Sequence, residues 1–120
     1  PMYRTNIPNQ VSGPFVGNLV VSMRPYEKSD VKTVTEITSS YPGAHGDPIH
    51  VGDPKSIGIQ DIDRPDFGDT IEIRNNEIPV FWACGVTPQS AIEAAKIPLA
   101  ITHSPGHMLI CDVLNSELRV

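Results

Sequence analysis

Short apolar runs separated by turn-forming residues recur along this chain, and they predict short strands rather than long helices. The run at residues 15–23 is rich in β-branched side chains and predicts a strand that Pro25 ends. Residues 1–13 contain proline, asparagine and glycine and are expected to be irregular. Three shorter apolar runs are further strand candidates, at residues 48–51, 99–102 and 108–113.

Apolar positions fall near helical spacing in two segments. Ser29 can cap a helix that runs to about Ser40, although the valines and threonines of this segment would also suit a strand. The second helix is predicted to have Thr87 as its cap and Pro88 at its first position, and to end before Pro98.

A β-hairpin is predicted where two apolar segments flank Asn75 and Asn76, residues that tolerate the positive φ angles of a tight turn. Its arms are residues 70–74 and 77–83, and Pro79 implies an edge or bulged position in the second arm. The order of elements argues for an α+β class, with a mixed, mostly antiparallel sheet and about two helices packed on it. A length of 120 residues fits a single domain, at residues 1–120.

Composition and charge exclude several classes of protein. The net charge is -5, and the nine basic residues are scattered, so no nucleic-acid partner is expected. No apolar stretch approaches the roughly 20 residues that span a bilayer, so no membrane partner is expected either. Cys84 and Cys111 are the only cysteines, which argues against a disulfide scaffold and favours a reducing compartment.

The segment from Cys84 to Gln89 is the first candidate site, because a strand is expected to end there and a helix to begin. The first N–H groups of a helix lack partners and carry partial positive charge, so such an end binds a carboxylate well. A cysteine beside it gains thiolate character and can act as a nucleophile or an acid–base group. The alternative is a buried structural cysteine next to an ordinary capped helix.

Two loops contain the four histidines of the chain. His103 and His107 flank a Pro-Gly pair, which excludes a helical metal-binding pair but lets both rings converge on one ligand. His45 and His50 lie with two aspartates within nine positions, a composition that fits a Zn or Mn site or a His–Asp acid–base pair. The histidines can equally bond backbone groups, and the aspartates can form turns before prolines.

The run PVFWACGVTPQ at residues 79–89 resembles the signature of the D-glutamate cyclase family, whose bacterial members are YcsI-type hydro-lyases. Other segments agree in the same order over nearly the whole chain, at residues 1–7, 20–25, 45–46, 48, 50–52, 57–59, 65–69, 102–103 and 105–109. Full family members are longer, and this chain is similar to their C-terminal half. Pro1 is then a fragment boundary rather than the catalytic N-terminal proline of a tautomerase, a family that Pro1-Met2-Tyr3 also resembles.

The resemblance implies a lyase that converts D-glutamate, a small amino-acid substrate, into 5-oxo-D-proline and water. The reaction must hold the α-carboxylate, keep the amine neutral and protonate the leaving oxygen. The expected substrate-binding residues are Arg24, His45, Gly85, Thr87 and Gln89. The expected catalytic residues are Cys84, His50, His103 and His107. No metal and no cofactor are expected for this reaction.

Two other interpretations stay open at this point. The chain can be a catalytically silent structural or interaction part of such a protein, or a metal-dependent hydrolase that uses His45, His50 and the nearby aspartates. The resemblance implies a cytoplasmic location for bacterial relatives and the mitochondrial matrix for animal ones. It leaves a homo-oligomer open.

Overall fold

A four-stranded antiparallel sheet lies at the centre of the computed structural model, which describes residues 1–108 and 110–120. The strands are β1 (Met2–Pro8), β2 (Asn18–Glu27), β3 (His50–Val51) and β4 (Glu77–Ala83), in the spatial order β1-β2-β4-β3. The predicted α+β class is confirmed. The predicted hydrophobic runs at residues 15–23, 48–51 and 77–83 became β2, β3 and β4 with shifted ends.

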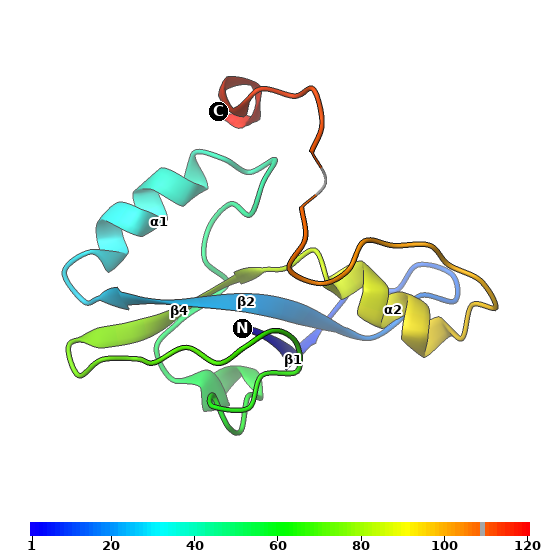
Figure 1. The fold of residues 1–120 in the computed structure, drawn as a ribbon, viewed down its shortest axis with the longest axis horizontal. Helices are drawn as coiled ribbons and strands as arrows, with labels where there is room; N and C mark the ends of the chain where they lie inside the picture. The colour runs from blue at the N-terminus through cyan, green and yellow to red at the C-terminus, as the bar shows by residue number, and fades with distance from the viewer. Residues whose placement is uncertain (109) are drawn as a thin grey trace.

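Helices α1 (Val31–Ser39) and α2 (Thr87–Ala95) lie on one side of the sheet, and the short 3₁₀ helix η1 (Pro54–Ile57) lies on the other (Figure 1). A second 3₁₀ helix, η2 (Asn115–Leu118), lies near the C-terminus. Both predicted α-helices are confirmed, but their caps were predicted one residue away from the observed ones. The observed N-caps are Asp30 and Val86, and neither makes a side-chain capping bond. No helix of the described residues is long and apolar enough to span a bilayer.

The strand register separates the side chains into two faces, because directly opposed residues share a face and neighbours alternate. Tyr3 opposes Val21, and Met23 opposes Phe81, so these residues share the η1 face. Together with Ile57 and Ile59 they form the larger core cluster. The opposite face carries a smaller cluster of Met2, Val20 and Val86 beneath α2.

Tyr3 is the one core residue with an ionisable side chain in the larger cluster, and its hydroxyl donates to Ile62 O at 2.7 Å. Burial, together with the smaller effects of the Asp63, Asp61 and Asp66 charges, raises the pKa of Tyr3 to about 12. The neutral phenol is therefore the form that the fold stabilises.

Two prolines predicted to disturb strands lie opposite each other inside the β2–β4 pair instead. Pro25 pairs with Pro79, and β2 continues to Glu27. Cys84 N donates to Val20 O, so Val20 and Cys84 form a hydrogen-bonded pair. Hydrogen-bonded and non-hydrogen-bonded pairs alternate along an antiparallel ladder, and the pair of prolines falls on a non-hydrogen-bonded position. A proline nitrogen at such a position points away from the partner strand, so the ladder loses nothing. The prediction that Pro25 ends the strand was wrong for this reason.

The predicted irregular start of the chain is also wrong, because residues 2–8 form β1 along β2. The predicted hairpin arm at residues 70–74 is not a strand, although the turn that follows does form, with Glu77 N bonded to Arg74 O. The edge of β4 where this arm would pair is occupied by β3, through His50 opposite Phe81.

The last two predicted strands are absent from the described residues. Residues 99–102 and the described part of 108–113, which excludes residue 109, have no strand pairing. Their described apolar side chains are exposed.

Candidate active site

A cavity of about 210 Å³ opens on the helix side of the sheet, next to α1. Its lining residues are Ser22, Arg24, Tyr26, Thr38, His45 and Trp82. Ser22, Arg24 and Tyr26 alternate along β2 and therefore share one face. Trp82 opposes Ser22 on β4 and donates from Nε1 to Thr38 Oγ1 at 3.3 Å, which ties α1 to the floor of the cavity.

Arg24 supplies the positive charge of this cavity. Its Nη1 donates to Met23 O at 2.8 Å, which restrains the guanidinium group and leaves its remaining N–H groups for other acceptors.

His45 forms the wall of the cavity nearest the end of β4. Its Nδ1 lies 2.6 Å from Ala83 O, and since a carbonyl only accepts, Nδ1 must carry the proton. In the neutral ring, Nε2 then has a free lone pair and can accept a proton. The same bond places His45 one peptide unit from Cys84, so the cavity adjoins the turn that leads into α2.

The turn from Cys84 into α2 is built around the backbone of Val20. Cys84 is a half-buried free thiol whose N–H donates to Val20 O at 3.0 Å. The Thr87 hydroxyl accepts from Val20 N at 2.9 Å and lies 3.1 Å from Val20 O, so it closes the end of β2. Thr87 N donates to Cys84 O at 3.0 Å, while Gly85 is exposed between them. The Thr87 hydroxyl, which the sequence predicted to bind substrate, therefore holds the end of β2 in place.

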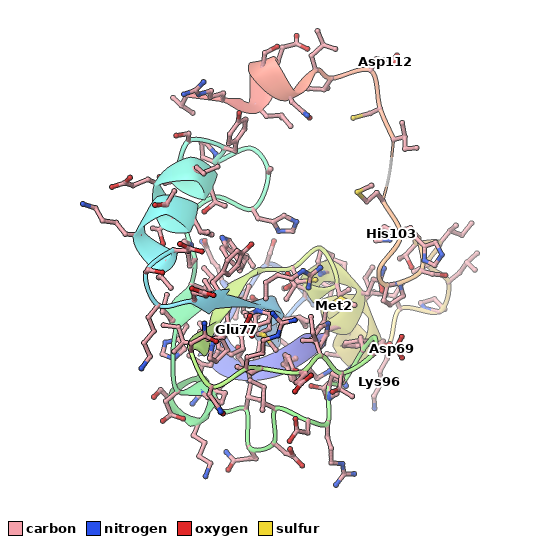
Figure 2. The ribbon with its side chains drawn as sticks, turned by 60° about the vertical axis from the view of Figure 1, so that its left-hand side comes forward. Met2, Asp69, Glu77, Lys96, His103 and Asp112 are labelled. Carbon is pink, nitrogen blue, oxygen red and sulfur yellow. The ribbon has the colours of Figure 1, made fainter. Side chains whose placement is uncertain are left out.

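Gln89 joins the start of α2 to the loop that follows the helix. Its Nε2 donates to His103 O at 2.6 Å, so the backbone of His103 lies beside α2. The His103 ring lies 2.8 Å from Ser104 O through Nδ1, and the exposed His107 ring lies 3.3 Å from Pro105 O. Figure 2 shows His103 at the base of the segment that rises from the body of the molecule towards Asp112.

His50 is not brought to the cavity. It opposes Phe81 in the β3–β4 pair, and the two rings lie 5.8 Å apart on the η1 face of the sheet. Its Nε2 lies 2.7 Å from Asp53 O. Because His45 and Arg24 lie on the helix side, the sheet separates His50 from them, and the expected convergence of His50 with Cys84 is not observed.

The loop of histidines and aspartates does not assemble a metal centre in the described residues. No group of three or more potential metal-ligating side chains occurs in residues 1–108 and 110–120. The Asp53 carboxylate instead caps η1, accepting from Lys55 N at 3.1 Å and from the Ser56 hydroxyl at 3.3 Å. This geometry favours the turn-forming interpretation of that aspartate over the metal-dependent hydrolase.

Sequence reasoning missed several cavity residues, namely Ser22, Tyr26, Thr38 and Trp82. A usable signal existed for two of them. Ser22 and Tyr26 alternate with Arg24, and an unbroken strand through Pro25 would have placed all three on one face. Thr38 is contributed by a separate helix, and no local pattern predicts its approach to Trp82.

Comparison with known proteins agrees with the motif at residues 79–89. A family model described as D-glutamate cyclase matches residues 1–112. A Burkholderia multivorans protein named "Putative hydro-lyase" is 59% identical over 120 residues, covering 100% of this chain and 46% of the relative. A Bordetella petrii protein of the same description is 58% identical, with the same coverage of both chains. The chain thus spans about half the length of the curated relatives it matches.

Proposed function

This chain belongs to the D-glutamate cyclase family, and from that premise we propose that the full-length protein is a hydro-lyase that converts D-glutamate into 5-oxo-D-proline and water. The observation that carries the proposal is the placement of Arg24 and His45 in one cavity that adjoins Cys84. A cavity of about 210 Å³ is smaller than the roughly 300 Å³ at the lower end of drug-sized pockets, and so it suits a small amino acid.

Arg24 is assigned to bind the α-carboxylate of the substrate. A guanidinium presents a planar fork of N–H donors that matches both oxygens of a carboxylate. The bond from Arg24 Nη1 to Met23 O restrains the side chain, so less rotamer freedom is lost when substrate binds. The Ser22 and Tyr26 hydroxyls on the same strand face can orient the rest of the ligand.

His45 is assigned the proton transfer. Its free Nε2 accepts a proton from the substrate ammonium, and the neutral amine then attacks the γ-carboxyl carbon. The new C–N bond forms as one C–O bond breaks, and the two protons that nitrogen gives up leave with the oxygen as water. His45 can return the first proton to the leaving oxygen, so no outside acid is needed for balance.

Cys84 can participate in one of two ways. As a nucleophile it would form a thioester with the γ-carbonyl before the amine displaces it. As a wall of the site it would only shape the turn before α2. Cys84→Ser separates these roles, because a serine retains the size of the side chain and loses most of the nucleophilicity.

The experiment uses a chimera in which these 120 residues replace the aligned part of the Burkholderia multivorans relative. The chimera is incubated with D-glutamate or L-glutamate, and 5-oxoproline is followed by mass spectrometry. We expect turnover of D-glutamate and a loss of at least about 100-fold in kcat for His45→Gln, the range of a removed general base. A chimera and a natural relative that both leave D-glutamate unchanged would refute the proposed reaction. Loss with His50→Gln but not with His45→Gln would refute the assignment of the base.

The 120-residue chain is assayed beside the chimera. Turnover by the chimera alone would assign this chain the role of a part that needs the rest of the protein. Turnover by both would place the complete machinery within these residues.

A further inference from the structure

The segment at residues 99–114, called the C-terminal arm below, exposes most of its large apolar side chains. The exposed members are Leu99, Ile101, Met108, Ile110, Val113 and Leu114. Ile101, Met108 and Ile110 are 93%, 88% and 89% exposed, close to the values of an unfolded chain. Monomeric proteins rarely leave such a run of apolar residues open unless it binds something.

The arm is nevertheless held at both ends. Gln89 Nε2 donates to His103 O at 2.6 Å near its start, and Val120 N donates to Ser40 O at 2.9 Å beyond its end. Between these points the arm passes from α2 to the level of α1 without lying on the sheet (Figures 1 and 2). Its apolar side chains are therefore presented on a tethered segment rather than on a free tail.

The two helices on this side of the sheet bury none of their own residues. Among the described residues, every fully buried hydrophobic residue lies at or before Val86. Neither α1 nor α2 contains a buried residue, and Ile37 of α1 faces solvent. None of the described apolar residues that follow Val86 is buried within these 120 residues.

The sequence pattern of the arm points to pairing that this chain cannot supply. Residues 99–102 and 108–113 have the apolar, β-branched composition of strands, and yet their described residues have no strand partner. The curated relatives contain more chain than this one, since 120 aligned residues cover only 46% of their length. The additional chain can therefore supply the partner that these unpaired segments lack.

We propose that the C-terminal arm is the docking surface for the part of the full-length polypeptide that lies outside these 120 residues. That part packs apolar side chains against Ile101, Met108 and Ile110 and covers the helix side of the sheet. The inference does not depend on which reaction the protein catalyses.

Hydrogen–deuterium exchange tests the proposal on the 120-residue chain, the chimera described above and the natural Burkholderia multivorans relative. We expect backbone amides of the arm to exchange at least about tenfold more slowly in the chimera and the relative than in the 120-residue chain. Peptides from β2 and β4 should exchange alike in all three. Equal, fast exchange of the arm in all three proteins would overturn the proposal.

A double variant of the chimera, Ile101→Asp with Ile110→Asp, adds a second measurement. We expect it to lose the protection of the arm, while Val11→Asp, an exposed apolar residue outside the arm, leaves that protection intact. A double variant that keeps full protection would overturn the proposal. So would protection of the arm in the 120-residue chain that rises with protein concentration, because a second copy would then be the occupant.

Discussion

Gly58 is held where a side chain cannot be accommodated, and replacing it tests the fold of the η1 face. It has φ +86° and ends η1, with its N–H bonded to Lys55 O. A Cβ built at this position would lie 2.9 Å from both Cβ and the backbone N of Asn6. Asn6 lies in β1 between the pairs Arg4–Val20 and Pro8–Asn18, so its backbone is held on both sides and has little room to move.

The cost of Gly58→Ala has two parts. A positive φ costs an alanine about 1–2 kcal/mol, and forcing an extra methyl into packed structure costs about 1–3 kcal/mol. The lower entropy of the unfolded alanine chain offsets about 0.4–1 kcal/mol. We therefore expect a loss of roughly 1–5 kcal/mol in the free energy of unfolding, which is a large part of the stability of a small domain.

Gly52→Ala is the matched control, because Gly52 has φ +96° and nothing lies within 4 Å of its virtual Cβ. It should show the backbone strain alone, about 1 kcal/mol or less after the entropic offset. Urea denaturation followed by the fluorescence of Trp82, the single tryptophan, measures both. Equal losses for the two variants would refute the steric argument. Adding Asn6→Gly should recover part of the Gly58→Ala loss, because it removes two of the three close atoms.

Three further predictions concern single side chains. Tyr3→Phe should cost about 1 kcal/mol through the lost bond to Ile62 O. In the wild-type chain, stability should fall between pH 10 and 12, because the phenol ionises near pH 10 in the unfolded state and only near pH 12 in the folded state. Tyr3→Phe should make this fall shallower, and identical alkaline slopes in urea titrations would contradict the argument. Thr87→Val should cost about 1–3 kcal/mol in thermal or urea unfolding by leaving the buried Val20 N–H without its partner, whereas Thr87→Ser should recover most of the loss. Arg24→Lys in the chimera should raise the KM for D-glutamate about tenfold or more by removing the planar fork, and an unchanged KM would contradict its assignment.

The sequence predicted those elements whose signals are local. α2 was predicted because Thr87 and Pro88 mark its start, and β4 because its apolar run is continuous. β1 was missed because its existence depends on pairing with β2, and its own composition includes Pro8. The predicted strand at residues 70–74 is absent for the opposite reason, because its local pattern suits a strand but β3 already occupies the available edge of β4.

The candidate site was predictable only in part, for a related reason. The segment at residues 84–89 could be identified because a strand end, a turn and a helix start follow one another in the chain. His45 and His50 could not be told apart by sequence, because five positions separate them and the two faces of the sheet divide them. The assignment of His45 rather than His50 needs the register of β3 against β4.

The outer edge of β1 protects the sheet against unwanted growth. Met2 N donates to Phe67 O, Phe67 N donates to Met2 O, and Arg4 N donates to a carboxylate oxygen of Asp66. The outward amides at the start of this strand are therefore already satisfied, and an incoming strand would have to break those bonds before it could pair. Edge-to-edge self-association into fibrils is disfavoured on this side for that reason. The PDFGD segment thus blocks this edge, and replacing Asp66 with a residue that cannot accept a hydrogen bond would free the Arg4 N–H while the Met2–Phe67 bonds stay in place.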